Sequence, residues 1–290
     1  MRKFTLFSDS SCDLPYDLLK ELSVEIFPLH YYFGSAEYED NKKEKDMTFK
    51  EFYDRMRSGE APTTSAVSVG QIEERFLTEA KAGRPVLYVA FSSGLSTTYN
   101  AGVQAAKLVK EKYPEAEIYV VDSLAASLGQ GLLVYLCAKK ADLGLSADAV
   151  RDYAESIKLN ICHYFTVDDL VYLKRGGRVS AATALVGGLL NIKPLLHVDN
   201  DGHLISIGKC RGRKTSIVAL ADSLKGNAFD YTSDVAFICH GDCIGDAELL
   251  KKILVEQYGF KKVVIGFTGP VIASHSGPGT LALFYVGGKR

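Results

Sequence analysis

Short apolar runs alternate with amphipathic segments through the first half of the chain. Four apolar runs are typical of buried strands, at residues 4–8, 24–32, 86–92 and 117–122. Between and after them, apolar residues recur at helical spacing and predict helices at residues 15–21, 49–57, 69–82, 96–112 and 128–143. Ser68 with Gln71, and Thr48 with Glu51, have the spacing of capping boxes at two of these helix starts. The alternation predicts a parallel sheet covered by helices on both faces.

The second half has a different pattern, because two of its predicted strands form a hairpin. Residues 194–198 and 203–209 flank Asn200-Asp201-Gly202, and an Asp-Gly turn between apolar runs is a strong hairpin signal. Further strands are predicted at residues 162–167, 235–239 and 262–267, and helices at residues 147–159, 169–174, 181–191, 214–225 and 247–257. The hairpin makes this second sheet mixed rather than purely parallel.

The length of 290 residues is sufficient for two domains of ordinary size. We therefore predict an α/β protein with an N-terminal domain in residues 1–160 and a C-terminal domain in residues 161–290. The first domain carries a mostly parallel sheet covered by helices, and the second a mixed sheet with helices. The predicted helix near residues 49–57 is able to pack on either domain.

Charge and composition exclude several classes of protein. The net charge is −1, so no global field recruits nucleic acid or an anionic membrane. The N-terminal apolar run is too short for a secretory signal, and no run approaches the ~20 apolar residues of a membrane span. The six cysteines are scattered along a large chain, which favours reduced thiols. We expect a cytoplasmic protein without stable membrane insertion, nucleic-acid partner, metal or cofactor.

Three polar segments fall at the predicted ends of helices and strands, at residues 62–65, 92–98 and 275–280. They are rich in serine and threonine, and the third contains His275 ahead of Gly277-Pro278-Gly279. In an open α/β sheet, ligands bind beyond the carboxyl ends of the strands, where helix N-termini also offer unpaired N–H groups. Uncharged donors of this kind suit a carboxylate or a phosphate. The alternative is that these hydroxyls only cap helices.

A basic segment follows the predicted helix at residues 169–174. Lys174, Arg175 and Arg178 place three cations within five positions. They either compensate the negative end of the helix dipole or form a docking or phosphate-handling patch, since arginine binds phosphate in a bidentate manner.

The segments leave three functional hypotheses open. The chain has no G-x-S-x-G nucleophile elbow and no G-x-G-x-x-G after its first strand, and a site rich in hydroxyls but poor in acids and bases suits binding better than catalysis. A ligand carrier without catalysis of its own is therefore the first hypothesis. The second is an enzyme acting on a small phosphorylated or acyl substrate, with His275 as acid or base. The third is a regulatory protein that uses the basic residues 174–178 and 209–214.

The ordered motifs resemble those of the DegV family. Residues 8–15 read Ser-Asp-Ser-Ser-Cys-Asp-Leu-Pro, which is similar to the family's opening motif, and residues 62–65, 91–99, 166–180 and 269–280 match its later motifs in the same order. The resemblance spans essentially the whole chain. It implies a fatty-acid-binding protein that holds a long-chain lipid between its two domains. Some family members are the acyl-carrying subunit of a bacterial fatty acid kinase, whose separate ATP-binding subunit phosphorylates the bound carboxylate.

Roles for individual residues follow from this resemblance. It implies that uncharged side chains bind the carboxylate, namely Thr64, Ser65, Ser93, Ser96, Thr97 and His275. It also implies that two arginines serve kinase docking or handling of the acyl phosphate, namely Arg175 and Arg178.

Two departures from the family pattern bear on the shape of the pocket. Ala66-Val67 stands where family members often have Gln-Pro, and Thr97 where many have Gly. For the acyl chain, the apolar segment at residues 181–191 is a candidate tunnel wall, through Ala184, Leu185 and Leu189.

Overall fold

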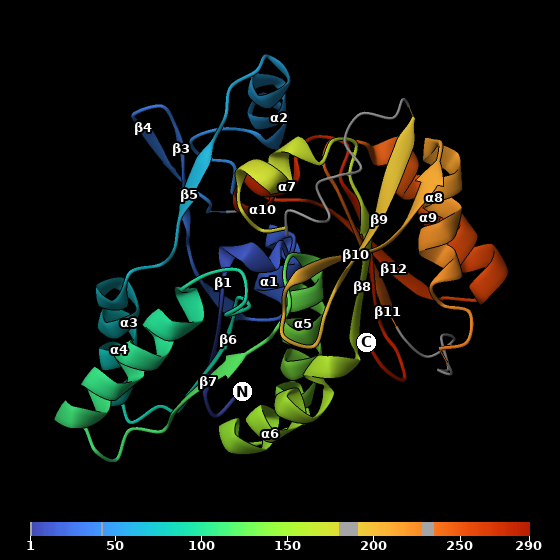
Figure 1. Cartoon of the computed structure of the whole chain (residues 1–290). Coiled ribbons are helices and arrows are strands. Elements are labelled where there is room, and N and C mark those ends of the chain that lie inside the picture. The colour runs from blue at the N-terminus through green and yellow to red at the C-terminus, as the bar shows by residue number, and fades with distance from the viewer. Residues whose placement is uncertain (1, 42, 180–190, 228–234) are drawn as a thin grey trace.

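The computed structural model describes residues 2–41, 43–179, 191–227 and 235–290. It has two α/β sheets, as predicted, and a small third sheet (Figure 1). The first sheet is entirely parallel, in the order β2-β1-β6-β7, with β1 at Thr5–Asp9, β2 at Val24–Phe27, β6 at Val86–Ala90 and β7 at Ile118–Asp122.

Helices cover both faces of this first sheet, as parallel strands require. On one side lie α3 (Val69–Lys81) and α4 (Thr98–Lys112). On the other lie α1 (Tyr16–Glu21), α5 (Leu128–Asp142) and α6 (Ala147–Ile157). Both predicted capping boxes are confirmed, at Thr48 before α2 (Phe49–Arg57) and at Ser68 before α3.

The second sheet is mixed, also as predicted. Its order is β10-β9-β8-β13-β11-β12; β11 and β12 are parallel, and the other pairs are antiparallel. The strands are β8 (Ile161–Thr166), β9 (Ile192–Val198), β10 (Leu204–Arg211), β11 (Val235–His240), β12 (Lys262–Phe267) and β13 (Leu281–Val286). Helices α8 (Arg213–Asp222) and α9 (Ile244–Tyr258) cover its outer face.

The third sheet differs from expectation, because the apolar run at residues 24–32 predicts a single strand. The run is two strands in different sheets, since Pro28 has no N–H for a ladder and separates β2 from β3 (His30–Phe33). Strand β3 pairs with β4 (Ala36–Glu39) on one side and with β5 (Thr63–Ser65) on the other, both antiparallel.

The C-terminal motif also differs from expectation. The sequence patterns predict no element here, but residues 270–276 form α10 (Pro270–Ser276), and residues 281–286 form the buried central strand β13 (Leu281–Val286). A short helix α7 (Val171–Arg175) carries the basic segment. The predicted helix at residues 181–191 lies outside the described residues except for Asn191.

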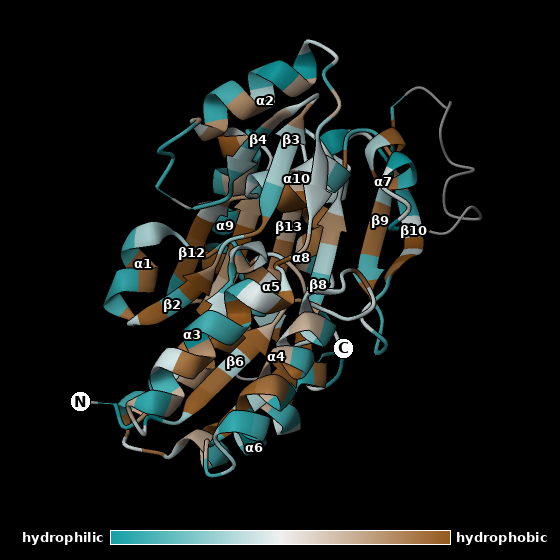
Figure 2. Ribbon diagram, turned by 90° about the vertical axis from the view of Figure 1, so that its left-hand side faces the viewer, coloured by the Kyte–Doolittle hydropathy of each residue, from teal (hydrophilic) through white to brown (hydrophobic). Residues whose placement is uncertain are grey.

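Helix α5 lies between the two large sheets. It contacts β6 of the first sheet and β8, β11 and β13 of the second. Its buried residues occur on every side of the helix, among them Leu128, Leu132, Leu133 and Val134. A helix that is apolar all round is a buried helix, and α5 thereby joins the cores of the two sheets into one cluster. Figure 2 shows the same division, with apolar strands inside and hydrophilic helix faces outside.

Helix α2 packs on both the third sheet and the C-terminal domain. Phe52 and Tyr53 join Tyr31 and Phe33 of β3 in one apolar cluster. The Tyr53 hydroxyl also donates a 2.6 Å hydrogen bond to the carbonyl of Thr268. The contacts of α2 thus cross the predicted domain boundary near residue 160, which itself stays a prediction.

The β9–β10 hairpin packs directly on the N-terminal domain. The Ser92 hydroxyl donates to the Gly202 carbonyl at 3.0 Å. A Cβ atom added at Gly94 would lie 2.8 Å from the Asp201 carbonyl oxygen, which is closer than real Cβ contacts allow. Gly94 is therefore required by the approach of the hairpin backbone.

This contact makes a first prediction. Gly94→Ala should lower the free energy of unfolding by about 1–3 kcal/mol, because the added methyl group overlaps the hairpin backbone. Gly70→Ala in α3 is the matched control, since nothing lies within 4 Å of its added Cβ; it should be neutral or stabilising by up to about 1 kcal/mol. Urea unfolding measures both. Equal effects of the two variants would show that the hairpin does not press on Gly94.

Candidate functional site

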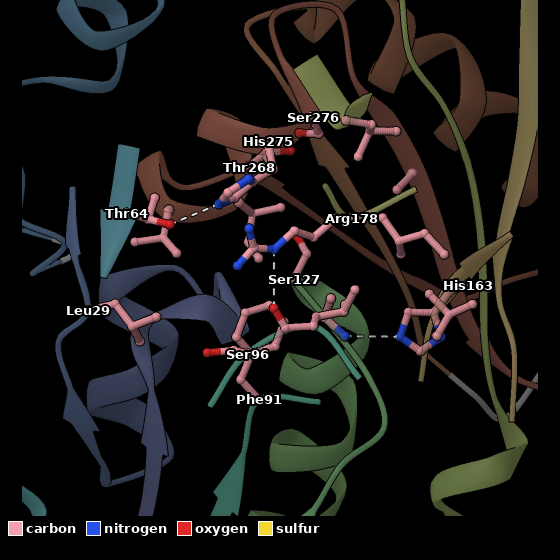
Figure 3. Close-up of a pocket in the computed structure, with 18 of the residues that line it drawn as sticks. Leu29, Thr64, Phe91, Ser96, Ser127, His163, Arg178, Thr268, His275 and Ser276 are labelled. Carbon is pink, nitrogen blue, oxygen red and sulfur yellow. Dashed lines mark hydrogen bonds between the residues drawn. The ribbon is translucent and has the colours of Figure 1, made fainter. Parts of the chain in front are cut away.

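A cavity of about 460 Å³ lies between the two large sheets. Its lining includes loop residues after β6 and alternate residues of β8 and β13 (Figure 3). Most of the predicted carboxylate-binding and basic residues line it, although they come from distant parts of the chain: Thr64, Ser65, Ser93, Ser96, Thr97, His275 and Arg178. Arg175 is the predicted residue that does not.

The loop after β6 brings hydroxyl groups to the N-terminus of α4. Ser96 accepts the Thr98 N–H at 3.2 Å and contacts the Thr98 hydroxyl at 2.9 Å, so its hydroxyl is used locally at the first residue of α4. The Ser93 hydroxyl is different, because it has no hydrogen-bond partner among the described residues. The Ser93 backbone N–H donates to Asp122 at 3.1 Å, which holds the loop in place. Ser93 therefore offers a free donor beside the positive end of the α4 dipole.

Thr64 and Ser65 point to opposite faces of strand β5, as successive strand residues do. The Thr64 hydroxyl lies 2.8 Å from His275 Nε2. The Ser65 hydroxyl lies 3.2 Å from the Tyr32 hydroxyl, which donates to the Glu37 carboxylate at 2.9 Å. Since the single Tyr32 proton goes to Glu37, Ser65 must donate its own proton to Tyr32. Thr64 is thus the residue of the pair with a hydroxyl directed to the histidine.

His275 is neutral at physiological pH. Burial lowers the pKa of its imidazole to about 4, and the charges of Arg178 and Arg175 add to the shift. Its Nδ1 atom is buried and has no hydrogen-bond partner in the described ranges. A Cβ added at Gly176 would lie 2.2 Å from this atom, so only glycine lets the end of α7 approach the ring.

The tautomer of His275 decides what Thr64 can do. A proton on Nδ1 would be a buried N–H without an acceptor, which is costlier than a bare lone pair. With the proton on Nε2, His275 donates to Thr64, and the Thr64 hydroxyl keeps its own proton for an anion. The geometry therefore favours a donor relay from His275 through Thr64 into the cavity.

The two arginines of the basic segment lie differently. The Arg178 Nε donates to the Leu95 carbonyl at 3.3 Å, so its side chain reaches the loop that carries Ser93 and Ser96 (Figure 3). Its guanidinium group also donates to the Gly176 carbonyl. Arg175 is exposed, with its guanidinium carbon 5.2 Å from the centre of the Tyr172 ring. Both arginines are exposed, but Arg178 lines the cavity at its polar end and Arg175 does not.

The opposite end of the cavity is apolar. Figure 3 shows His163 across the cavity from the Thr64–His275 pair. Its Nδ1 is 2.9 Å from the Ile161 carbonyl, and its Nε2 accepts the Ala126 N–H at 3.4 Å. Burial lowers the pKa of His163 well below its usual value. A neutral imidazole with both nitrogens occupied leaves ring carbon surface toward the cavity.

The sequence analysis missed the apolar wall. Leu29, Phe165, Leu173, Val198, Leu204 and Phe284 line the cavity. The wall that it did propose, through Ala184, Leu185 and Leu189, lies outside the described residues. Alternation along β8 was an available signal, because His163 and Phe165 share a face, but nothing in the sequence showed which face meets the cavity.

Two further hydroxyls were missed. The side-chain oxygens of Thr268 and Ser276 are buried and lack a hydrogen-bond partner within the described part of the chain, and both residues line the cavity.

Membrane-spanning helices and metal clusters are absent from the described residues. None of the helices there has the length and apolar character that a membrane span requires, and no group of three or more His, Cys, Asp or Glu side chains is placed to hold a metal ion.

The fold and the cavity define a two-domain α/β protein with a ligand-sized pocket between its domains. The chain belongs to the DegV family: the family model described as "Uncharacterised protein, DegV family" matches residues 3–287. A DegV domain-containing protein of Clostridium perfringens is 43% identical over 290 residues, covering 100% of this chain and 99% of the relative. The resemblance found in the sequence is thereby confirmed.

Two solved structures have the same fold as this chain. A DegV family protein from Thermus thermophilus, described as fatty-acid-binding, is 31% identical with a TM-score of 0.87, covering 99% of this chain and 100% of the other. A protein from Eubacterium ventriosum, described as stearic-acid-binding, is 28% identical with a TM-score of 0.85, covering 98% of each chain.

The low pKa of His275 makes a second prediction. The unfolded histidine binds a proton below its usual value of about 6.5, whereas the folded one stays neutral down to about 4. The free energy of unfolding should therefore fall as pH drops through this window. Urea unfolding at stepped pH should show a shallower slope for His275→Gln than for the native chain. An unchanged slope would mean that His275 has the same pKa in the folded and the unfolded protein.

Proposed function

We propose that this chain binds a long-chain fatty acid in the cavity between its domains. The proposal rests on one observation: this cavity has a polar end and an apolar end. Thr64, Ser93 and His275 gather at one end, and aromatic and aliphatic side chains of β8, β9 and β13 line the other. A fatty acid has the same division between headgroup and chain.

The polar end suits a carboxylate better than a cation or a neutral group. The Thr64 relay and the free Ser93 hydroxyl provide uncharged donors, and the N-terminus of α4 adds its dipole. Arg178 adds a positive charge at the same end. Hydrogen bonds to a charged acceptor contribute about 1.5–3 kcal/mol each, so these donors are able to offset desolvation of the headgroup.

The apolar end supplies affinity. At ~0.8 kcal/mol per buried CH₂, about a dozen methylenes contribute on the order of 10 kcal/mol. Association opposes this with roughly 4 kcal/mol or more. The balance of about 6 kcal/mol or less corresponds to a dissociation constant of tens of micromolar or weaker from the acyl chain alone. The cavity of about 460 Å³ also falls in the usual range for small-molecule sites. Relatives from Thermus thermophilus and Eubacterium ventriosum, described as fatty-acid-binding and stearic-acid-binding, support the assignment.

We further propose that the bound carboxylate is presented to a separate ATP-dependent kinase subunit in the cytoplasm, which forms the acyl phosphate. This chain then has no catalytic step of its own. Exposed Arg175 lies three residues from Arg178 at the polar end, which suits docking or phosphate contact. The alternative, an enzyme with His275 as acid or base, has less support, because a pKa of about 4 is far from the value that a base needs at neutral pH.

Fatty-acid binding makes a third prediction. Native mass spectrometry of purified protein with added oleate should show one bound lipid. Thr64→Val should weaken binding by roughly tenfold, since a headgroup donor is worth about 1–3 kcal/mol. Ser65→Ala is the matched control and should bind nearly as well as the native chain, because its hydroxyl is already used by Tyr32. No uptake of oleate or palmitate by the native chain would overturn the proposed function, and a larger loss for Ser65→Ala would reverse the assignment of the two hydroxyls.

Kinase docking makes a fourth prediction. Arg175→Glu should abolish formation of acyl phosphate when ATP and the ATP-binding subunit of a bacterial fatty acid kinase are added, while oleate affinity stays unchanged. Lys110→Glu is the control, because this exposed cation lies at the far end of α4 from the cavity. Normal turnover by the Arg175 variant would count against docking through this residue.

A further inference from the structure

The carboxyl group of Asp9, at the end of β1, is fully buried and has no cationic partner. Its residue is 0% exposed, and none of the described Lys, Arg or His side chains forms an ion pair with it. An isolated buried carboxylate is costly, so such groups are paired, heavily hydrogen-bonded or neutral. Its titratable neighbour is the Tyr88 phenol, which is not a cation.

One oxygen of Asp9 holds the strand that leads into the ligand loop. Oδ2 accepts the Phe91 backbone N–H at 2.9 Å and the Tyr88 hydroxyl at 2.9 Å. Phe91 lines the cavity and stands two residues before Ser93. The position of the Ser93 hydroxyl thus depends on a bond that Asp9 makes.

The other oxygen belongs to a chain of hydrogen bonds in which the protons can be counted. Oδ1 accepts the Ser11 N–H at 3.2 Å and lies in very close contact with the Ser11 hydroxyl. That hydroxyl also lies 2.8 Å from Gln130 Oε1. Ser11 has one hydroxyl proton, so it cannot donate to both oxygens.

The orientation of the Gln130 amide is fixed by its other partners. Its Nε2 lies 3.1 Å from the Ser8 hydroxyl and 3.3 Å from the Val89 carbonyl. A carbonyl only accepts, so the nitrogen must face it, and the Ser8 hydroxyl donates to the same carbonyl at 2.9 Å. Oε1 therefore faces Ser11 and takes its proton. Every contact then has one proton if Asp9 is protonated and donates to the Ser11 hydroxyl. Burial raises the pKa of Asp9 and so favours the same protonated state.

We propose that Asp9 is held as a neutral carboxylic acid and is a positioning residue for the carboxylate-binding loop at residues 91–96. The second part rests on the proposed function. A neutral acid accepts the Phe91 N–H without placing a second negative charge in the same domain as the bound carboxylate, where low dielectric would strengthen the repulsion. The Ser8-Asp9-Ser10-Ser11 segment thereby gains a role in ligand binding although none of its side chains lines the cavity.

Three variants test the positioning role through oleate affinity. Asp9→Ala removes the acceptor for Phe91 and should weaken binding by roughly tenfold or more, as expected for a lost buried acceptor. Asp9→Asn should restore binding to within about threefold of the native value, because its amide accepts from Phe91 and donates to Ser11 as the neutral acid does. Tyr88→Phe is the control and should bind oleate about as well as the native chain. It removes another hydrogen bond to Asp9 but keeps the one from the Phe91 N–H.

The outcomes discriminate between the possible states of Asp9. Native-like affinity of Asp9→Ala would overturn the positioning role. An Asp9→Asn affinity as weak as that of Asp9→Ala would show that the ionised form is needed and would overturn the neutral acid.

A second measurement needs no ligand and does not depend on whether Asp9→Ala folds. The ¹³C signal of the Asp9 carboxyl, assigned by its absence in Asp9→Asn, should have the shift of a protonated acid at neutral pH. A carboxylate shift at neutral pH would overturn the proposal. If the native chain fails to bind oleate but the Asp9 carboxyl has the shift of a protonated acid, the proposed function would be overturned and the neutral state of Asp9 would be supported.

Discussion

The burial of helix α5 between two sheets is the constraint on which the rest of the structure depends. Most helices in this fold have one face in a core and one in water, but the first two turns of α5, residues 128–134, are buried on every side. It therefore cannot leave either sheet without exposing the other half of its surface. The cavity lies at the N-terminal end of this helix, where Ala126 and Ser127 belong to its lining. The site is thus a consequence of how the two domains are joined.

The two domains contribute different groups to the cavity lining. The N-terminal domain contributes Ser93 and the α4 helix end, and the third sheet contributes Thr64. The C-terminal domain contributes His275, Arg178 and most of the apolar wall. Each group is weak alone, but glycine residues let segments that are distant in the sequence approach closely enough for the groups to converge. Gly176 against His275, and Gly94 against the hairpin, are the clearest cases.

Local pattern predicted most of the fold, because the two sheets and their helices follow from alternation and capping. The α/β class, the mixed second sheet and the bounds of α2 and β12 are confirmed. The failures occurred where distant contacts decide. One apolar run became two strands in different sheets at Pro28, and the apolar residues 281–286 became the centre of the second sheet. Periodicity does not report which sheet a strand joins.

The sequence alone determined the inventory of the site: its hydroxyls, its histidine, its arginines and the family that carries them in this order. Tertiary structure decided what each can do. It turned Ser65 toward Tyr32 and Thr64 toward His275, and it placed Arg178 in the cavity lining but not Arg175. It also built an apolar wall from strands that the sequence did not connect with the ligand. The reason is physical: residue type fixes the donors and acceptors, but only packing between distant segments fixes where their protons point.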